Sequence, residues 1–524
     1  METCDYVVIG AGSAGCAVAA RLSEEAAARV LLIEAGGTDQ HPEVSDPTKW
    51  PTILHGPLDW GYMTTPMRHA NDRVDHCPRA KMLGGCHSHN ANAWVRGHPA
   101  DYDAWAYAGN PGWDWASVLP VFKRIENWQG PASPARGVGG PMWVSPPETV
   151  GVLAQACLEA GREVGLTVLD DINGPSLEGI GYFNFTIKHG RRFSVADAYL
   201  RPAMQRPNLR VVTDIEVHRL LFEGTRCTGA LCATRQGVVQ VRATREVVLC
   251  AGAIGSPRVL LLSGVGPAAD LARLGIPVQL DLPGVGRNLH DHALLGGVAY
   301  ELVGELPPLV NNAAETTWWW RSSPSAFSPD TQPVLIEFPF ATPELADRLT
   351  PNAFTLAPSI VRPSSRGSLT LASSDPTRLP LIDINFLESR ADRDALIAAT
   401  ALCREMGAAK AFDGIRKREL MPGPLSRSGM EDFARNAVTT YFHPAGSCRM
   451  GTDALSVVDP QLRVHGIDGL RVADASIMPA ITTGNTNAPS IMIGERAAEF
   501  MRTQTASQPF TAGLSEAGHL EPRS

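Results

Sequence analysis

The chain has 524 residues, of which 44% are hydrophobic and 19% are charged, and its formal net charge is −8. This length predicts two or three lobes with a substantial core, and the composition excludes a disordered chain. The negative charge disfavours nucleic acid and anionic membrane surfaces as partners. No run reaches the ~18 apolar residues of a membrane span, and the N-terminus lacks the pattern of a signal peptide, so we expect a cytoplasmic protein.

The ten cysteines form no C-x-x-C pair. Zinc and dithiol redox motifs therefore have no support, and we expect reduced cysteines that act as small core residues. We predict no metal site.

The first 35 residues predict a β-α-β unit. An apolar strand over Tyr6–Gly10 precedes a helix of small residues over Gly15–Leu22, and Arg29–Glu34 forms a second apolar run. This order of strand, helix and strand within about 30 residues is typical of nucleotide-binding folds. Residues 36–110 are rich in Pro, Gly, His and Trp and predict an extended loop with short helices.

Further along the chain, helical and strand patterns alternate. Helices are predicted over Trp115–Glu126, Val150–Val164, Val195–Met204, Asp392–Met406 and Ala488–Met501. The runs Leu209–Thr213, Glu216–Phe222, Gly229–Thr234 and Val238–Ala243 alternate like a small antiparallel meander, and further strands are predicted over Glu246–Cys250, Val334–Phe338, Gly367–Leu371 and Gly469–Ala473. The character of residues 295–440 differs from that of the N-terminal part, which indicates a second lobe.

A glycine-rich motif stands between the first strand and the first helix. Gly10, Gly12 and Gly15 fit G-x-G-x-x-G, and Glu34 ends the next strand about 20 residues later. The glycines let backbone N–H groups approach a pyrophosphate at the helix N-terminus, and the acid accepts hydrogen bonds from a ribose hydroxyl. The motif predicts a dinucleotide site and disfavours NADP, but it leaves FAD and NAD both open.

Five other segments decide between these cofactors. They are Pro78–Asn90 (PRAKMLGGCHSHN), Gly252–Pro267 (GAIGSPRVLLLSGVGP), His443–Gly451 (HPAGSCRMG), Gly469–Ser476 (GLRVADAS) and Gly484–Pro489 (GNTNAP). In sequence and in order they resemble the signatures of the glucose–methanol–choline (GMC) oxidoreductases. The resemblance spans nearly the whole chain, and in the flavin motif it is strongest to the choline-oxidising members.

The resemblance implies FAD as cofactor and an α/β fold, α+β overall. A Rossmann-type FAD-binding lobe would be formed by residues 1–155, 201–295 and 441–503. A substrate lobe with an antiparallel sheet and helices would be formed by residues 156–200 and 296–440, and residues 504–524 would be a mobile tail. The residues assigned to FAD are Gly10, Gly12, Ser13, Ala14, Gly15, Glu34, Ala35, Trp60, Gly84, Gly85, Ser88, His89, Asn90, Ala91, Val217, Ala251, Gly252, Asp474, Ala475 and Asn487.

The resemblance also implies oxidation of an alcohol by hydride transfer to flavin N5. The hydroxyl proton must leave at nearly the same moment as the hydride, and histidine is the natural base near neutral pH. His443 stands at the family's catalytic histidine, and Asn485 at the second member of the pair. An amide can donate to the alcohol oxygen but cannot act as a base, so we assign the base to His443. Asn487 falls where relatives hold the flavin, and the roles of the two asparagines could be exchanged.

His89 falls where some choline-oxidising relatives bond a histidine to the flavin 8α carbon. Such a bond would raise the flavin potential and prevent cofactor loss. Covalent attachment through His89 is the expectation, and a histidine packed against the ring without a bond is the alternative. His87 and His89 form a His-x-His pair, but no further zinc ligands cluster near them in the sequence.

The substrate is expected to be a primary alcohol or a polyol. Choline remains an alternative, because Glu315 with Trp318–Trp320 could form an aromatic cage with a carboxylate, although these tryptophans could equally pack between the lobes. Ala91, Arg362 and Tyr441 depart from the residues of choline-oxidising relatives, and Arg362 would repel a cation if it faced the site.

Oxygen or another electron acceptor, no nucleic acid, no membrane span and a monomer or homodimer complete the expectations. The alternative function is that of a hydroxynitrile lyase-like GMC protein without net redox chemistry. A non-catalytic flavoprotein is a third reading, against which the intact His443–Asn485 pair argues.

Overall fold

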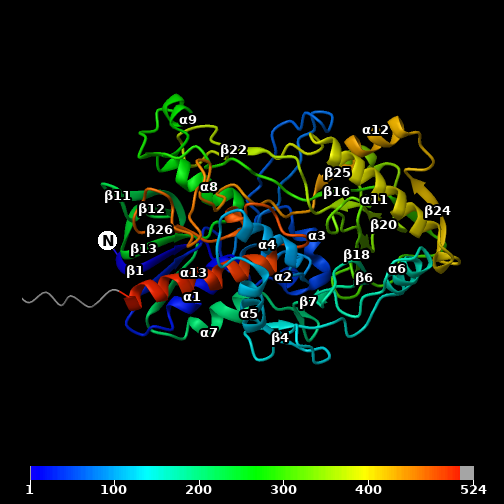
Figure 1. The fold of residues 1–524 in the computed structure, drawn as a ribbon, viewed down its shortest axis with the longest axis horizontal. Coiled ribbons are helices and arrows are strands. Elements are labelled where there is room, and N and C mark those ends of the chain that lie inside the picture. Colours follow the sequence, from blue (N-terminus) through cyan, green and yellow to red (C-terminus); the bar gives the residue numbers. More distant parts are fainter. Residues whose placement is uncertain (1, 508–524) are drawn as a thin grey trace, which may run out of the picture.

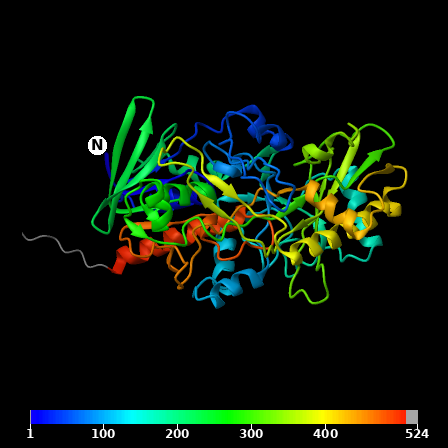
Figure 2. The same cartoon turned by 90° about the horizontal axis from the view of Figure 1, so that it is seen from above.

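Two large sheets stand at opposite ends of the molecule in the computed structural model, which describes residues 2–507 (Figure 1). The seven-stranded sheet has the order β10-β2-β1-β13-β12-β11, and β26 also pairs with β13. Its strands are β1 (Glu2–Ile9), β2 (Val30–Ile33), β10 (Leu209–Val212), β11 (Glu216–Glu223), β12 (Arg226–Thr234), β13 (Gly237–Leu249) and β26 (Leu470–Val472). Seen from above, the segments between the two sheets fill the middle of the molecule (Figure 2).

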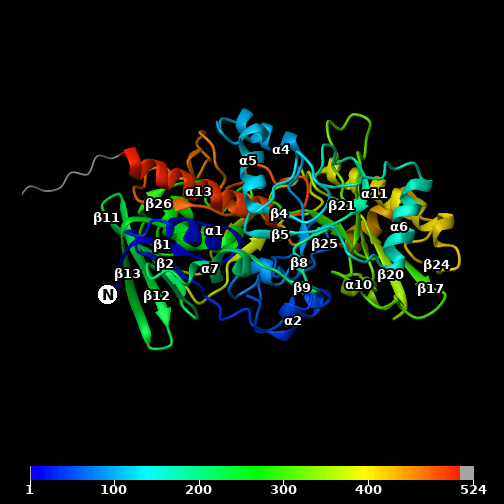
Figure 3. The ribbon, with the colours of Figure 1, turned by 90° about the horizontal axis from the view of Figure 1, so that it is seen from below.

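The predicted β-α-β unit is confirmed. β1 and β2 pair in parallel from Tyr6–Val30 to Ile9–Ile33, and α1 (Ser13–Leu22) connects them. Every residue of β2 is buried, as expected for a parallel strand covered on both faces. The last described helix, α13 (Asn487–Ser507), packs along α1, so two helices far apart in the sequence lie side by side next to the nucleotide motif (Figure 3).

Two details of the predicted meander are wrong. The run that begins at Leu209 forms β10, which pairs with β2 in parallel and not with the meander. Alternation in a run of four residues does not specify a partner, and the turn of helix before β10 carries the chain across to the edge of the sheet. The two strands predicted over Val238–Ala243 and Glu246–Cys250 are one strand, β13, whose first part pairs antiparallel with β12 and whose last part pairs parallel with β26.

The six-stranded sheet has the order β24-β17-β20-β19-β18-β6, and all its pairs are antiparallel. Its strands are β6 (Gly179–Tyr182), β17 (Ala299–Leu302), β18 (Thr316–Trp319), β19 (Val334–Ile336), β20 (Ala353–Ala357) and β24 (Arg416–Met421). α6 (Val152–Glu163) and α11 (Arg390–Ala408) pack against this sheet, and their bounds agree closely with the helices predicted over Val150–Val164 and Asp392–Met406. The lobe boundaries given above remain predictions.

The remaining helices differ from the predictions mainly at their ends. α5 (Trp115–Ile125) matches its prediction, whereas the one over 195–204 is a π-helical turn, Ala196–Leu200, followed by α7 (Arg201–Ala203). α4 (Pro99–Tyr107) is one of the short helices expected within residues 36–110, whereas α8 (Gly252–Leu262) and α12 (Arg427–Ala437) were not predicted. α13 runs to Ser507, so the first residues of the predicted tail are helical, and residues 508–524 lie outside the described part of the chain. Over residues 2–507, every helix is too short or too polar to cross a bilayer.

Candidate active site

A cavity of about 260 Å³ is lined by residues of both sheets and of the segments between them. One part lies at the glycine motif and the carboxyl ends of β1 and β2, where an open α/β sheet binds its ligands. The other part lies against the six-stranded sheet. His443 and Asn485 line the same cavity.

Two glycine segments meet at the nucleotide end of the cavity. Gly10 has φ +101°, and a Cβ added there would lie 2.5 Å from the carbonyl oxygen of Cys250. Gly85 has φ +53°, and its Cβ would lie 2.6 Å from the Cα of Gly12. The two loops therefore touch backbone to backbone, which only glycine allows.

The N-terminus of α1 has free hydrogen-bond donors. Gly12 is the N-cap residue and provides no side-chain cap, so the first N–H groups of the helix are left for another partner. Glu34, at the end of β2, lines the cavity and accepts hydrogen bonds from the N–H groups of Ala11 and Gly36, both at 2.8 Å. Burial raises the pKa of Glu34, and these two N–H groups oppose the shift.

Asn487 and Asp474 hold the loops around the same end of the cavity. Ser13 Oγ donates to Asn487 Oδ1 at 2.7 Å, and the Nδ2 of Asn487 is buried without a partner in the described structure. Asp474 Oδ2 accepts from the N–H of Gly252 at 2.9 Å and from Ser256 Oγ at 2.6 Å.

Most residues assigned to FAD line the cavity. They are Gly10, Gly12, Ser13, Ala14, Glu34, Ala35, Trp60, Gly85, His89, Asn90, Ala91, Val217, Ala251, Gly252, Asp474, Ala475 and Asn487. Gly15, Gly84 and Ser88 do not. Gly15 is needed for packing, because a Cβ there would lie 1.9 Å from the carbonyl oxygen of Gly10, and Ser88 Oγ donates to the carbonyl of Leu83 instead of facing the cavity.

These features fit a dinucleotide cofactor. The uncapped helix N-terminus suits a pyrophosphate, and Glu34 suits a ribose. The unpartnered Nδ2 of Asn487 and both unpartnered ring nitrogens of His89 are buried polar atoms that a bound ligand would satisfy.

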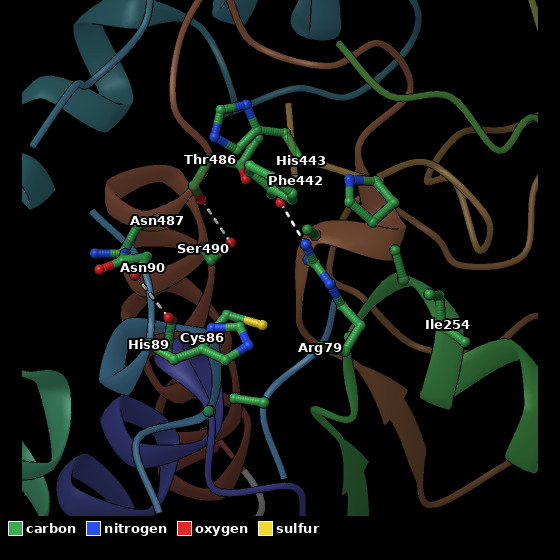
Figure 4. A pocket seen from close by; sticks show the side chains of 18 of the residues that line it. Arg79, Cys86, His89, Asn90, Ile254, Phe442, His443, Thr486, Asn487 and Ser490 are labelled. Atoms are coloured by element: carbon green, nitrogen blue, oxygen red, sulfur yellow. Dashed lines mark hydrogen bonds between the residues drawn. The ribbon is translucent and has the colours of Figure 1, made fainter. Parts of the chain in front are cut away.

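The predicted catalytic pair is in contact. Asn485 Nδ2 lies 3.2 Å from His443 Nε2, and Gln332 Nε2 donates to Asn485 Oδ1 at 3.1 Å. On its other side, His443 Nδ1 lies 3.0 Å from Nδ1 of His292. The backbone N–H of His443 donates to Asp291 Oδ1 at 2.9 Å, which fixes the loop. His443 is 9% exposed, and its ring faces the cavity above His89 and Cys86 (Figure 4).

The contacts of Asn485 and His292 indicate which nitrogen of His443 is free. Gln332 holds the oxygen of Asn485, so Asn485 Nδ2 donates to His443 Nε2, and a neutral His443 then carries its hydrogen on Nδ1, toward His292. Burial lowers the pKa of His292 to about 3, so the ring is neutral and its Nδ1 is an acceptor. His443 therefore donates through Nδ1–H and keeps the lone pair on Nε2, toward Asn485 and the cavity.

Burial, and then the proximity of His292 and the positive charge of Arg79, holds the pKa of His443 well below its usual range. His443 is therefore neutral at physiological pH, as a base must be before it takes a proton.

His89 faces the cavity at the opposite end from His443 (Figure 4). Its Nε2 lies 3.6 Å from Asp59 Oδ2, and burial lowers its pKa, so the imidazole is neutral. Asp59 also accepts from His76 Nε2 at 2.9 Å, and His76 stacks on the exposed ring of His55 at 4.3 Å. Asp59 could not be identified from the sequence, because it lies in a loop 30 residues before His89.

Of the two alternatives left open for Glu315 and Trp318–Trp320, the aromatic cage is wrong. None of these residues lines the cavity, and Trp318 and Trp319 are fully buried in the packing around β18. As consecutive residues of a strand they point to opposite faces, and each is buried in a different hydrophobic cluster. Arg362 does not line the cavity either, because its guanidinium pairs with Asp101 Oδ1 at 2.9 Å. The expected repulsion between Arg362 and a cationic substrate therefore has no structural basis.

The two histidines of the His-x-His pair point to different places. His87 Nε2 lies 3.0 Å from Thr186 Oγ1, and its Nδ1 accepts from the N–H of Val195 at 3.1 Å. Across residues 2–507, no three His, Cys, Asp or Glu side chains converge as metal ligands would. Nine of the ten cysteines are buried, and the tenth, Cys86, lines the cavity beside His89.

Comparisons with known proteins agree with this geometry. Two GMC oxidoreductase domain families match residues 4–294 and 363–494. An oxygen-dependent choline dehydrogenase of Sinorhizobium fredii is 38% identical over 94% of this chain and 95% of its own length. An uncharacterised GMC-type oxidoreductase of Mycobacterium bovis is 39% identical over 95% of this chain and 99% of its own.

Solved structures show the same fold. A pyridoxine 4-oxidase of Mesorbium loti has a TM-score of 0.92 at 36% identity and covers 96% of this chain and 100% of its own. A formate oxidase of Aspergillus oryzae has a TM-score of 0.88 at 26% identity and covers 96% of this chain and 99% of its own. With both domain families matched, a cradle that fits FAD, and relatives aligned from end to end, the chain belongs to the GMC oxidoreductase family, whose members bind FAD.

Proposed function

We propose that this GMC oxidoreductase oxidises an alcohol, a primary alcohol or a polyol, to its carbonyl compound, with His443 as the base and Asn485 as its partner. The observation that carries the proposal is the contact of 3.2 Å between His443 Nε2 and Asn485 Nδ2 at the cavity wall. FAD, when bound in the cavity, supplies the acceptor for the hydride. Oxygen or another acceptor then removes the electrons, and oxygen uptake during turnover distinguishes an oxidase from a dehydrogenase.

The residues of the chain divide the proton chemistry between them. His443 Nε2 takes the hydroxyl proton, and its Nδ1–H stays bonded to His292. Asn485 donates from Nδ2 to the alcohol oxygen as negative charge develops there, since Gln332 holds its carbonyl oxygen in place. Asn487, whose contact is with Ser13 at the N-terminus of α1, is better placed to hold the cofactor than to assist His443. This supports the assignment of the two asparagines made from the sequence.

Anaerobic flavin reduction tests the proposal. Mixing the enzyme with a panel of primary alcohols should bleach the flavin absorbance, and His443→Ala should slow this reduction by roughly 10²–10⁴ with the FAD still bound. His189→Ala, in an exposed turn away from the cavity, is the matched control and should react like the wild type. Bleaching at the wild-type rate in His443→Ala would refute the role of His443. The relatives give no support to a lyase, which would leave the flavin yellow.

We further propose that His89 is bonded covalently to the flavin. The support is a neutral imidazole at the cavity wall, with both nitrogens unpartnered and the Asp59 carboxylate 3.6 Å from Nε2 to receive its proton. Forming a bond from a nitrogen of His89 to the 8α carbon would release one proton from each atom and two electrons, for which the bound flavin would be the first acceptor and oxygen or another oxidant the final one.

Acid precipitation tests the bond. Wild-type protein should keep its flavin in the pellet and gain the mass of FAD, whereas His89→Ala should release flavin into the supernatant. His87→Gln is the control, because His87 faces Thr186 and Val195 instead of the cavity. A yellow supernatant from the wild type would refute the bond and leave the alcohol oxidation proposal intact.

A further inference from the structure

We infer that the substrate is a neutral primary alcohol with an apolar aryl or branched alkyl body, and that neither a cationic amino alcohol such as choline nor a polyol is the preferred substrate. The inference rests on the proposed oxidation at His443 and narrows its substrate class. It follows from the walls of the cavity on the side of the six-stranded sheet.

The wall on this side is almost entirely apolar. It is formed by Trp50, Leu54, Ala91, Ala93, Phe183, Leu294, Asn312, Ala314, Val334, Ile336, Phe340, Tyr441 and Phe442. None of these side chains carries a charge. Such a wall gains free energy by covering hydrocarbon, at roughly 25 cal/mol per Å² of apolar surface.

Few polar atoms on this wall are free to bind a substrate. The amide of Asn312 is occupied, because its Nδ2 donates to the carbonyl of Ala91 and its Oδ1 accepts from the N–H of Ala314. The indole N–H of Trp50 donates to the carbonyl of Asn312. The hydroxyl of Tyr441 is buried without a partner within the described structure. One free hydroxyl can serve one polar group, whereas each additional hydroxyl of a polyol would be buried unsatisfied, at a cost of about 1–3 kcal/mol.

Two acidic residues that directly follow wall residues in the sequence, Glu315 and Glu337, point away from the cavity. On β19, Val334 and Ile336 line the cavity. Glu337 follows Ile336 and does not line the cavity, because side chains alternate between the two faces of an extended chain. Glu315 likewise follows the cavity residue Ala314 and is bonded to the N–H of Gly151 at 2.8 Å. Both carboxyls are therefore engaged behind the wall and do not face a substrate.

The acidic side chains that line the cavity, Glu34, Glu216 and Asp474, belong to its nucleotide end, whereas a positive charge lies toward His443. Arg79 lines the cavity, and its guanidinium donates to the backbone carbonyls of Pro78 and Phe442 (Figure 4). Among the described residues, no carboxylate lies within ion-pair distance of Arg79. The field of Arg79 reaches His443, since it contributes to the lowered pKa of that residue. A trimethylammonium group beside His443 would meet the same field. Aromatic faces attract such a cation, but the field of Arg79 opposes this attraction, and no carboxylate stands on the apolar wall to balance it.

A pair of substrates that differ only in charge tests the inference. Choline and its neutral carbon isostere, 3,3-dimethylbutan-1-ol, should be compared as reductants of the holoenzyme flavin under anaerobic conditions, with benzyl alcohol and sorbitol as further arms. We expect the second-order rate constant of flavin reduction to be at least ~10-fold higher for the isostere than for choline, and sorbitol to be the poorest of the four.

Two variants connect the preference to the residues named above. Arg79→Gln should raise the choline-to-isostere ratio by about tenfold, and Tyr441→Phe should leave that ratio unchanged, because it removes no charge. A choline rate equal to or above that of the isostere, or sorbitol as the best substrate, would overturn the inference and leave the proposed function standing. If no alcohol reduced a flavin that dithionite does reduce, the proposed function would fall, and the inference with it.

Discussion

Replacing His292 tests whether this buried ring fixes the tautomer of His443. His292 does not line the cavity, so it acts on catalysis only through the contact of 3.0 Å between the two Nδ1 atoms. His292→Phe keeps a planar ring and removes the acceptor. His292→Asn is the conservative variant, because a side-chain oxygen on the γ carbon can accept the same hydrogen.

The size of the effect follows from that hydrogen bond. When His443 takes the substrate proton, its Nδ1–H belongs to an imidazolium, and a hydrogen bond to a charged group contributes about 1.5–3 kcal/mol. At 1.36 kcal/mol per decade, flavin reduction should slow by about 10- to 150-fold in His292→Phe. Substrate affinity should stay within about twofold, because no atom of the cavity wall is changed.

Stopped-flow reduction over a range of alcohol concentrations separates the two quantities. His292→Asn should recover most of the lost rate, and the ¹⁵N resonances of labelled His443 should show a protonated Nδ1 in the wild type and a mixed tautomer in His292→Phe. A thermal midpoint close to that of the wild type would show that the variants fold. If His292→Asn were as slow as His292→Phe, or if His443 carried its proton on Nε2, the assignment of the tautomer would be wrong.

Two further predictions concern buried acids away from His443. Burial, and then the charge of Glu315, raises the pKa of Glu337 to about 8. Between the ordinary pKa of a glutamate and pH 8, the folded protein therefore holds a proton that the unfolded chain has released. The free energy of unfolding falls as the pH rises through this range. Glu337→Gln should therefore raise the thermal midpoint more at pH 8 than at pH 5, and Glu223→Gln, at an exposed position, is the control. An equal shift of the midpoint at the two pH values would contradict the raised pKa of Glu337. Asp59→Asn removes the carboxylate beside His89 and should slow covalent attachment, measured as acid-stable flavin during incubation of apoprotein with FAD; attachment at the wild-type rate would show that Asp59 takes no part.

The elements with strong local patterns were the ones that the sequence could predict. β1, α1 and β2 combine a buried run, a glycine turn and small helical residues, so their type and order follow from local chemistry. The partner of β10 could not be predicted, since four residues contain no information on whether a neighbour runs parallel or antiparallel. The short β-strands of the six-stranded sheet are joined across long loops, and sequence spacing does not determine their order.

In the site, long motifs pointed to His443, Asn485 and Glu34, and all three line one cavity, while their roles stay predictions. The cage proposed around Glu315 failed, because a run of tryptophans looks the same in sequence whether it faces a cavity or a core. Arg79 lies inside a quoted motif and His292 lies outside all of them, and their roles depend on contacts with residues 363 and 151 positions away in the chain. Only the folded chain shows such contacts.

The backbone contact between Gly12 and Gly85 limits how this enzyme can be divided or redesigned. Because a loop outside the β-α-β unit presses directly on the nucleotide turn, the first 35 residues cannot serve as an interchangeable cassette. A graft of that unit into another scaffold would lose the opposing loop. An insertion near Gly85 would displace the glycine turn that is proposed to bind the pyrophosphate. Directed evolution of this protein is therefore better started at the apolar wall than at the cofactor cradle.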